Sequence, residues 1–197
     1  MTVNKMQTEE QFSQEVDTIS SPIQGTVESR FNQNTEGWTI TADGVLTWNS
    51  NEGNPGGCLR VDDRAVGTGY FYSAPSKFLG DKRYALRLDY DVRWDSSINP
   101  PIVRAATVKL FGEDRTLHYD TDLYPPKGAW FHYRIALRPG EGWTNAATGE
   151  PATRNDFLAV LSSLRSMHIR GEYIRGDEVG HLDNVVMHIG KDAPIFP

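Results

Sequence analysis

Alternation of apolar and polar residues is the dominant pattern from Val27 onward. In the segment YALRLDYDVRW at 84–94, large apolar residues occupy every second position and charged residues stand between them. Successive side chains of a β-strand point to opposite faces, so this alternation predicts strands with one face in a core. The segments TVKLF (107–111) and WFHYRIALR (130–138) repeat the pattern. The predicted core positions are Leu86, Leu88, Tyr90, Val92, Trp94, Val108, Leu110, Phe131, Tyr133, Ile135 and Leu137.

One segment, TRNDFLAVLSSLRSM, departs from this alternation and predicts a short α-helix near 153–166. Thr153 followed three residues later by Asp156 has the form of a capping box, which satisfies backbone N–H groups at a helix start. The apolar residues at helical spacing are Phe157, Val160, Leu161 and Leu164. Many strands separated by Gly, Pro and Asn clusters, with a single helix, predict an all-β fold, an antiparallel β-sandwich.

Two stretches of the chain interrupt the strands in a specific way. GNPGG at 53–57 supplies positive-φ turn positions before the predicted strand CLRVDD. In APSKFLGD at 74–81, Pro75 removes a ladder donor and prevents the strand from continuing.

Residues 1–26 are polar with only a weak helical pattern, so they are expected to form an N-terminal extension, and 27–197 the sandwich domain.

The order of these motifs resembles the laminin IV domain, also called the laminin B domain. The matching features are FNQNTEGW (31–38), Trp48, GNPGGCLRVDD (53–63), YFYSAPSKFLGD (70–81), Trp130, Gly142–Trp143, the helical segment 152–173, and LDNV (182–185). The resemblance implies a jelly-roll sandwich similar to carbohydrate-binding modules, with Phe78 and Leu79 closing one end of it. Members of this family lie within extracellular matrix chains, whereas this domain lacks flanking cysteine-rich repeats, and so a stand-alone or microbial relative is suggested.

Composition and charge narrow the partners. The chain has 197 residues and a net charge of −6, so it has no basic surplus with which to bind nucleic acid. No apolar run reaches the roughly 18 residues of a membrane-spanning helix, so membrane insertion is not expected. The N-terminus lacks the apolar stretch of a signal peptide, whereas the resemblance implies an extracellular protein, which leaves the compartment open. The single cysteine, Cys58, excludes an internal disulfide and is expected to be buried.

The polar face of the predicted strands is the candidate binding surface. A water-facing sheet normally carries such charges, and the alternative is a groove in which they hydrogen-bond sugar hydroxyls. Trp143 is the expected stacking residue, with Tyr124 and Trp130 as further candidates. The predicted ligand-binding residues are Arg87, Asp89, Asp91, Arg93, His132, Arg134, Trp143, Arg170 and Glu172, with Lys109 on the same face.

Metal binding is predicted only for calcium. The five histidines have no zinc-like spacing, and His181 and His188, seven residues apart, should lie on opposite faces of a regular strand. The resemblance implies one structural calcium ion where the first and last strands meet, held by Asp183 with Asn32 or Glu28. Oxygen ligands of this kind suit calcium. The other interpretation of Asp183 is a carboxylate that accepts backbone hydrogen bonds.

Three functions are consistent with the sequence. The favoured one is a non-catalytic module that binds carbohydrate or a glycosylated partner through the polar sheet face. The second is a protein–protein assembly module that uses loops and the N-terminal tail. The third is a polysaccharide-acting lyase or glycosidase, for which Asp89 and Asp91 stand about 6–7 Å apart from strand rise alone. No motif fixes a nucleophile or an acid–base pair, which favours binding over catalysis.

Overall fold

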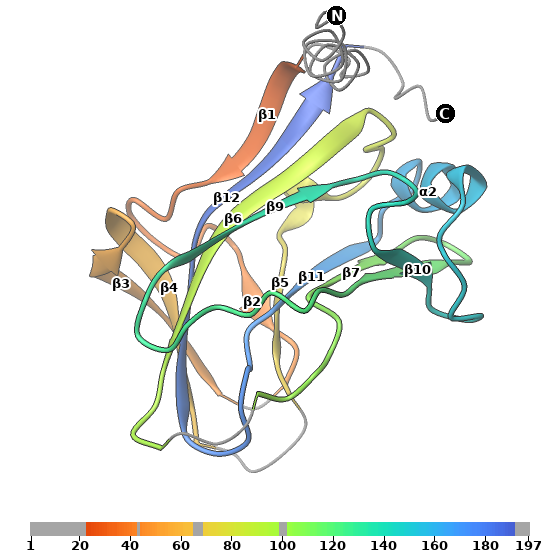
Figure 1. Ribbon diagram of the computed structural model, residues 1–197. Helices are drawn as coiled ribbons and strands as arrows, with labels where there is room; N and C mark the ends of the chain where they lie inside the picture. Colours follow the sequence, from red (N-terminus) through yellow and green to blue (C-terminus); the bar gives the residue numbers. More distant parts are fainter. Residues whose placement is uncertain (1–22, 43, 65–68, 99–101, 192–197) are drawn as a thin grey trace, which may run out of the picture.

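The computed structural model describes residues 23–42, 44–64, 69–98 and 102–191. This part of the chain forms two antiparallel sheets of six strands each (Figure 1). Sheet A has the order β3-β4-β12-β6-β9, with β1 also paired to β12, and sheet B has the order β10-β8-β7-β11-β5-β2. The all-β antiparallel sandwich predicted from the alternation is therefore confirmed.

The elements follow one another along the chain in a simple order. They are β1 (Ile23–Ser29), β2 (Thr39–Ile40), β3 (Val45–Gly53), β4 (Gly56–Asp63), β5 (Phe71–Ser73), the 3-10 turn η1 (Ser76–Phe78), β6 (Ala85–Asp95), β7 (Val108–Phe111), β8 (Thr116–Tyr119), β9 (Phe131–Ala136), β10 (Trp143–Asn145), α2 (Arg154–Leu161), β11 (Ser166–Arg170) and β12 (Glu178–Gly190). The domain boundary expected at residue 27 falls inside β1, because Ile23, Gly25 and Thr26 already pair with the end of β12. No helix in the described ranges is long and apolar enough to cross a membrane.

The core lies between the sheets and is built from the predicted alternation. Leu88, Tyr90, Val92 and Trp94 of β6 are at most 3% exposed, and Leu86 at the strand start is half-buried. Val108, Leu110, Tyr133, Ile135 and Leu137 are buried as predicted, while Phe131 is partly buried. Complete burial of such side chains contributes about 1.5–3 kcal/mol each relative to exposure. The opposite side of each strand is thereby fixed as an outer face.

A bulge in β12 changes which residues share a face. The pairing with β6 runs from Asp183↔Asp91 to Val186↔Asp89, so β12 has one extra residue at this point. Asn184 takes a φ of 49° there, a conformation that asparagine tolerates better than most residues. As a result His181 pairs beside Arg93 and His188 beside Arg87, both on the outer face. The expectation that these histidines lie on opposite faces was wrong because it assumed a regular strand.

The helix begins where predicted and ends earlier. Thr153 caps α2 and forms the full capping box with Asp156. The helix stops at Leu161 rather than near 166, because Leu164 exchanges backbone hydrogen bonds with Gly80. Leu164 therefore forms a β-bridge with Gly80, which follows η1, and its side chain is still buried. The chain then enters β11 at Ser166.

The two glycine-containing interruptions are architectural. Phe78 is fully buried, with its ring centroid 5.5 Å from that of Trp38, and Leu79 is partly buried beside it. At Gly57 a Cβ would lie 2.2 Å from the Phe31 carbonyl oxygen, so only glycine fits between β4 and that backbone. The next residue, Cys58, is buried as expected, and burial raises the pKa of its thiol to about 12.

Gly180 of β12 offers a direct test of the packing. A Cβ at this position would lie 1.9 Å from the hydroxyl oxygen of Tyr70, whose side chain is buried. We expect Gly180→Ala to lower the free energy of unfolding by about 1–3 kcal/mol, the range for overpacked cores. Urea denaturation followed by tryptophan fluorescence measures this change.

Gly25→Ala in β1 is the matched control, since nothing lies within 4 Å of a Cβ there. Its free energy of unfolding should stay within about 0.5 kcal/mol of the native value. Equal destabilisation by both substitutions would contradict the close approach of Tyr70 to β12.

Candidate functional site

The outer face of sheet A brings together most of the residues predicted to bind a ligand. Asp91 pairs with His132, and Asp89 with Arg134, across β6 and β9. Arg87 and Arg93 lie on the same face of β6. The sequence therefore predicted correctly that these six side chains share one surface.

The carboxylates on that face are buried and satisfied by neighbouring side chains. Asp91, 5% exposed, lies 2.7 Å from His132 Nδ1 and accepts hydrogen bonds from the side-chain amides of Asn54 (3.2 Å) and Asn184 (2.8 Å). Asp89, 7% exposed, accepts from Arg87 Nε at 2.8 Å and lies 3.0 Å from His188 Nε2. A carboxylate with such partners has little capacity left for a ligand. Asp89 and Asp91 are too buried to act on a substrate as the two carboxylates of a glycosidase.

The β3–β4 hairpin closes this face further. The backbone N–H of Asn54 donates to Asp183 Oδ2 at 2.6 Å, and Asn184 Nδ2 donates to the Asn54 carbonyl at 2.6 Å. Asp183 is completely buried and also accepts from the Asn184 N–H at 2.6 Å. Burial raises the pKa of its carboxyl to about 6, and the nearby Asp91 adds to the shift, although both backbone bonds oppose it.

The predicted calcium ligands are engaged by other groups. Glu28 accepts from the Arg30 guanidinium at 3.0 and 3.2 Å, and this positive charge would repel a cation. Asn32 is an exposed residue after β1. Asp183 fits the alternative interpretation of a carboxylate that accepts backbone hydrogen bonds. These contacts do not fit a calcium ligand set, and calcium binding stays a prediction.

The structure corrects three predicted binding residues. Trp143 is 2% exposed, packs against Tyr119 and Phe157, and donates to the Ala136 carbonyl, so it cannot stack on a sugar. Arg170 is 2% exposed, and its guanidinium donates to carbonyl groups at 103, 105 and 172. Glu172 is 8% exposed, and burial raises its pKa. Alternation alone did not reveal that Trp143 packs against β8 and α2, or that the 102–107 segment binds the Arg170 guanidinium.

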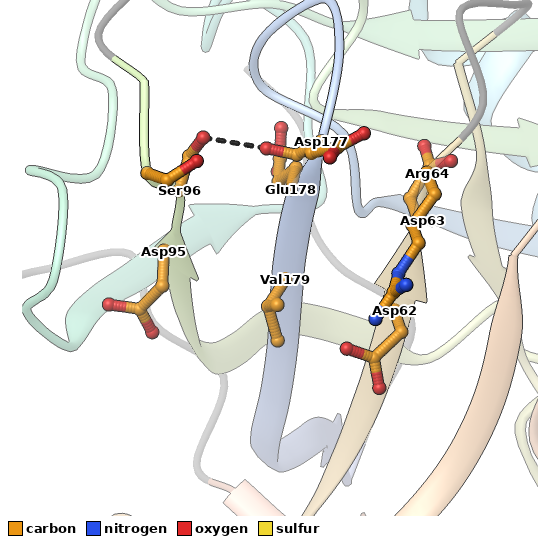
Figure 2. Close-up of a pocket in the computed structure, with 9 residues that line it drawn as sticks. Asp62, Asp63, Arg64, Asp95, Ser96, Asp177, Glu178 and Val179 are labelled. Carbon is orange, nitrogen blue, oxygen red and sulfur yellow. Dashed lines mark hydrogen bonds between the residues drawn. The ribbon is translucent and has the colours of Figure 1, made fainter.

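An acidic hollow of about 320 Å³ lies at one end of sheet A, and Figure 2 shows the side chains that line it. Its described lining is Asp62, Asp63, Arg64, Asp95, Ser96, Ser97, Asp177, Glu178 and Val179. Burial raises the pKa of Glu178 to about 8, a shift that often marks acid–base chemistry. Here, however, Glu178 is 2% exposed and its carboxylate accepts the backbone N–H groups of Tyr173 and Ile174. Its position indicates a role in ordering the loop before β12.

The outer face of sheet B carries a different surface, which we call the sheet B platform: Phe71, Lys109, Phe111, His118 and His168. Its members come from four strands, and the register places Lys109 between His118 and His168. Lys109 Nζ lies 4.0 Å from the centre of the Phe71 ring, and the His168 ring lies 4.8 Å from that of Phe111. All five residues are partly exposed.

The charge of the platform comes from Lys109 and acts on both histidines. Burial lowers the pKa of Lys109, and burial together with the Lys109 charge lowers the pKa values of His118 and His168. No carboxylate contributes to any of these shifts. Among the described residues, none forms an ion pair with Lys109. The platform is therefore a positively charged surface in which Lys109 lies between the rings of His118 and His168.

Sequence reasoning missed the platform although its signal was partly visible. Alternation in TVKLF, TLHY and SMHIR points Lys109, His118 and His168 away from the core. The expectation that Lys109 shares a face with Arg87 was wrong, because β7 lies in sheet B and β6 in sheet A. Which strands become neighbours depends on long-range pairing that alternation does not encode.

Comparison with known proteins agrees with this architecture. The profile of the laminin B (domain IV) family matches residues 71–195. This chain belongs to the laminin B family. Human laminin subunit alpha-1 is 22% identical over 135 residues, which cover 63% of this chain and 4% of that protein. The domain thus matches a small part of the curated relatives' length.

Solved structures place the family fold beside that of carbohydrate-binding modules. The L4b domain of human laminin alpha-2 superposes with a TM-score of 0.64 at 14% identity, covering 87% of this chain and all of that one. The CBM22-1 xylan-binding domain of Paenibacillus barcinonensis Xyn10C gives a TM-score of 0.56 at 13% identity, covering 88% and 99%. At these identities the likeness establishes the fold alone.

Glu178 makes the stability of this laminin B domain pH-dependent. Below about pH 4.5 its carboxyl is protonated in both states, and between 4.5 and about 8 only the folded state keeps the proton. Raising the pH in this window therefore favours unfolding, by about 1.4 kcal/mol per pH unit at most. We expect Glu178→Gln, a neutral mimic, to gain stability relative to the native protein between pH 5 and 7.5, as measured by urea titrations.

Taking the difference between the two proteins cancels the opposite contribution of the histidines, whose lowered pKa values favour folding as the pH rises toward 6.5. A difference that is constant from pH 5 to 7.5 would show that Glu178 is ionised in the folded state at neutral pH.

Proposed function

We propose that this laminin B domain is a non-catalytic module that binds a glycan, free or on a glycosylated partner, through the sheet B platform. The observation that carries the proposal is the row of partly exposed rings and nitrogen donors on one outer face, formed by Phe71, Phe111, His168, Lys109 and His118. The same fold in a xylan-binding domain supports it as an analogy.

Sugars offer two kinds of surface that the platform matches. The apolar face of a pyranose ring packs on aromatic side chains, and its hydroxyl groups accept hydrogen bonds from fixed donors. Phe71 and Phe111 lie on either side of His168, with ring centroids 6.2 and 4.8 Å from the imidazole. Lys109 and His118 continue the same row on β7 and β8. The row therefore presents rings and donors side by side.

Sheet A supports the same function less well. Its acids and bases bind one another, and ligand binding there would have to break contacts such as Arg87–Asp89 and His132–Asp91. Ion pairs with exposed side chains add little to the free energy of unfolding. A buried carboxylate that loses its hydrogen-bond donors, however, destabilises the protein. The platform needs no such rearrangement.

Removing the platform rings tests the proposal. We expect Phe71→Ala and Phe111→Ala each to weaken binding of a glycan, first identified on a broad array, by about tenfold, or about 1.4 kcal/mol, because each removes apolar surface on which a sugar ring packs. Isothermal titration calorimetry measures the affinity, and circular dichroism confirms that each variant is folded.

Arg134→Ala is the control on the sheet A face, where Arg134 is exposed. It should leave the affinity unchanged. Weakening by Arg134→Ala but not by the two phenylalanine variants would move the site to sheet A. A blank array would favour the protein–protein alternative, and steady release of shortened product would show an enzyme.

A further inference from the structure

We infer that the ligand of the sheet B platform is an acidic glycan, whose carboxylate or sulfate groups pair with Lys109 and the two flanking histidines. This inference rests on the proposed function and adds the charge class of the ligand. It depends on how the cations of the two outer faces are partnered.

On sheet A, three outer-face arginines have an acid two residues further along the same strand, whereas exposed Arg134 of β9 is followed there by Ala136. Arg60 pairs with Asp62 at 2.8 Å, Arg87 with Asp89 at 2.8 Å, and Arg93 with Asp95 at 2.9 Å. Because residues i and i+2 of a strand share a face, each guanidinium is neutralised locally. These cations are not available to an anionic ligand without loss of an existing pair.

On sheet B the residue two positions further along is Phe111 for Lys109 and Arg170 for His168. For His118 it is Asp120, which follows the end of β8 and accepts a hydrogen bond from the Thr121 N–H. The register row across the sheet reads Thr144, His118, Lys109, His168, Ser73 and Thr39. The other neighbours along the strands include Phe111, Thr116 and Ser166, which have no carboxylate. In a chain of net charge −6, a row of three nitrogen bases without a carboxylate is a local reversal of sign.

Within the described part of the chain, the Lys109 ammonium contacts the Phe71 ring, whose centre lies 4.0 Å from Nζ. A cation–π contact of a partly desolvated lysine offsets some of the lost hydration but brings no counter-charge. An anionic group on the ligand would supply that charge while its sugar ring packs on Phe71. Adjacent strands lie about 4.8 Å apart, so the row from His118 to His168 spans roughly 10 Å. More than one sugar unit can therefore contact it.

The histidines give the same ligand class a pH signature. His168 faces Lys109 on β7, Ser73 on β5, the rings of Phe71 and Phe111, and Ser166, whose Oγ lies 2.8 Å from Nε2. His118 faces Lys109 and Thr144. Lys109 is the charged group that acts on both histidines. Two further charges follow along their strands: Arg170, whose guanidinium is bound to backbone carbonyls, and Asp120, which accepts from the Thr121 N–H. A bound anion would favour the protonated imidazoles, so affinity for an acidic glycan should rise as the pH falls from 7.5 to 5.5.

The test compares polygalacturonate, heparin and unsubstituted xylan as probes, by calorimetry at a fixed ionic strength. The native domain should bind at least one of the two acidic polymers about tenfold or more tightly than xylan. Lys109→Gln should weaken acidic binding about tenfold and change xylan binding less than twofold. Lys109→Arg should keep most of the acidic binding. Polygalacturonate and heparin distinguish carboxylate from sulfate as the anion.

Lys191→Gln is the matched control, because it removes the same charge from an exposed lysine after β12. It should leave all affinities unchanged, whereas equal losses in the two glutamine variants would show non-specific attraction and overturn the inference. Equal affinity for xylan and the acidic polymers, or no gain at pH 5.5, would also overturn it while leaving glycan binding intact. No binding to any of the three probes or to a glycan array would remove the proposed function itself.

Discussion

The hydrogen bonding of β12 on both of its edges is the constraint on which the rest of this domain depends. This strand pairs with β4 and then β1 along one edge and with β6 along the other. Figure 1 shows β12 between β1 and β6, extending along most of the molecule. Its first residue, Glu178, orders the preceding loop through the Tyr173 and Ile174 amides. Its bulge at Asn184 brings His181 and His188 to the outer face.

The two outer faces differ because of what this strand and its neighbours carry. Buried polar groups need partners, and Asp183 and Asp91 find them in Asn54 and Asn184. The β3–β4 hairpin therefore binds to the sheet A face, and the carboxylates there hydrogen-bond to the protein itself. Sheet B has short strands and no such network around Lys109, so its rings and cations remain available. This difference between the two polar faces is the reason for proposing sheet B as the binding surface.

The fold was predictable because its signals are local, whereas the site was not. The alternation of β6 and the capping box of Thr153 and Asp156 are properties of neighbouring residues, and both are confirmed. Trp143, Arg170 and Lys109 were misplaced because burial and sheet membership depend on segments distant in the chain. A bulge such as the one at Asn184 reverses the facing of every later residue in a strand, and alternation alone does not mark it.

We propose that ligands contact sheet B and not sheet A. Nuclear magnetic resonance of the 15N-labelled domain, titrated with an oligogalacturonate, distinguishes the two faces. We expect concentration-dependent shifts at the amides of Phe71, Lys109, His118 and His168, with those of Asp89, Asp91 and His132 unmoved. Shifts confined to the sheet A residues, with the platform unmoved, would contradict it.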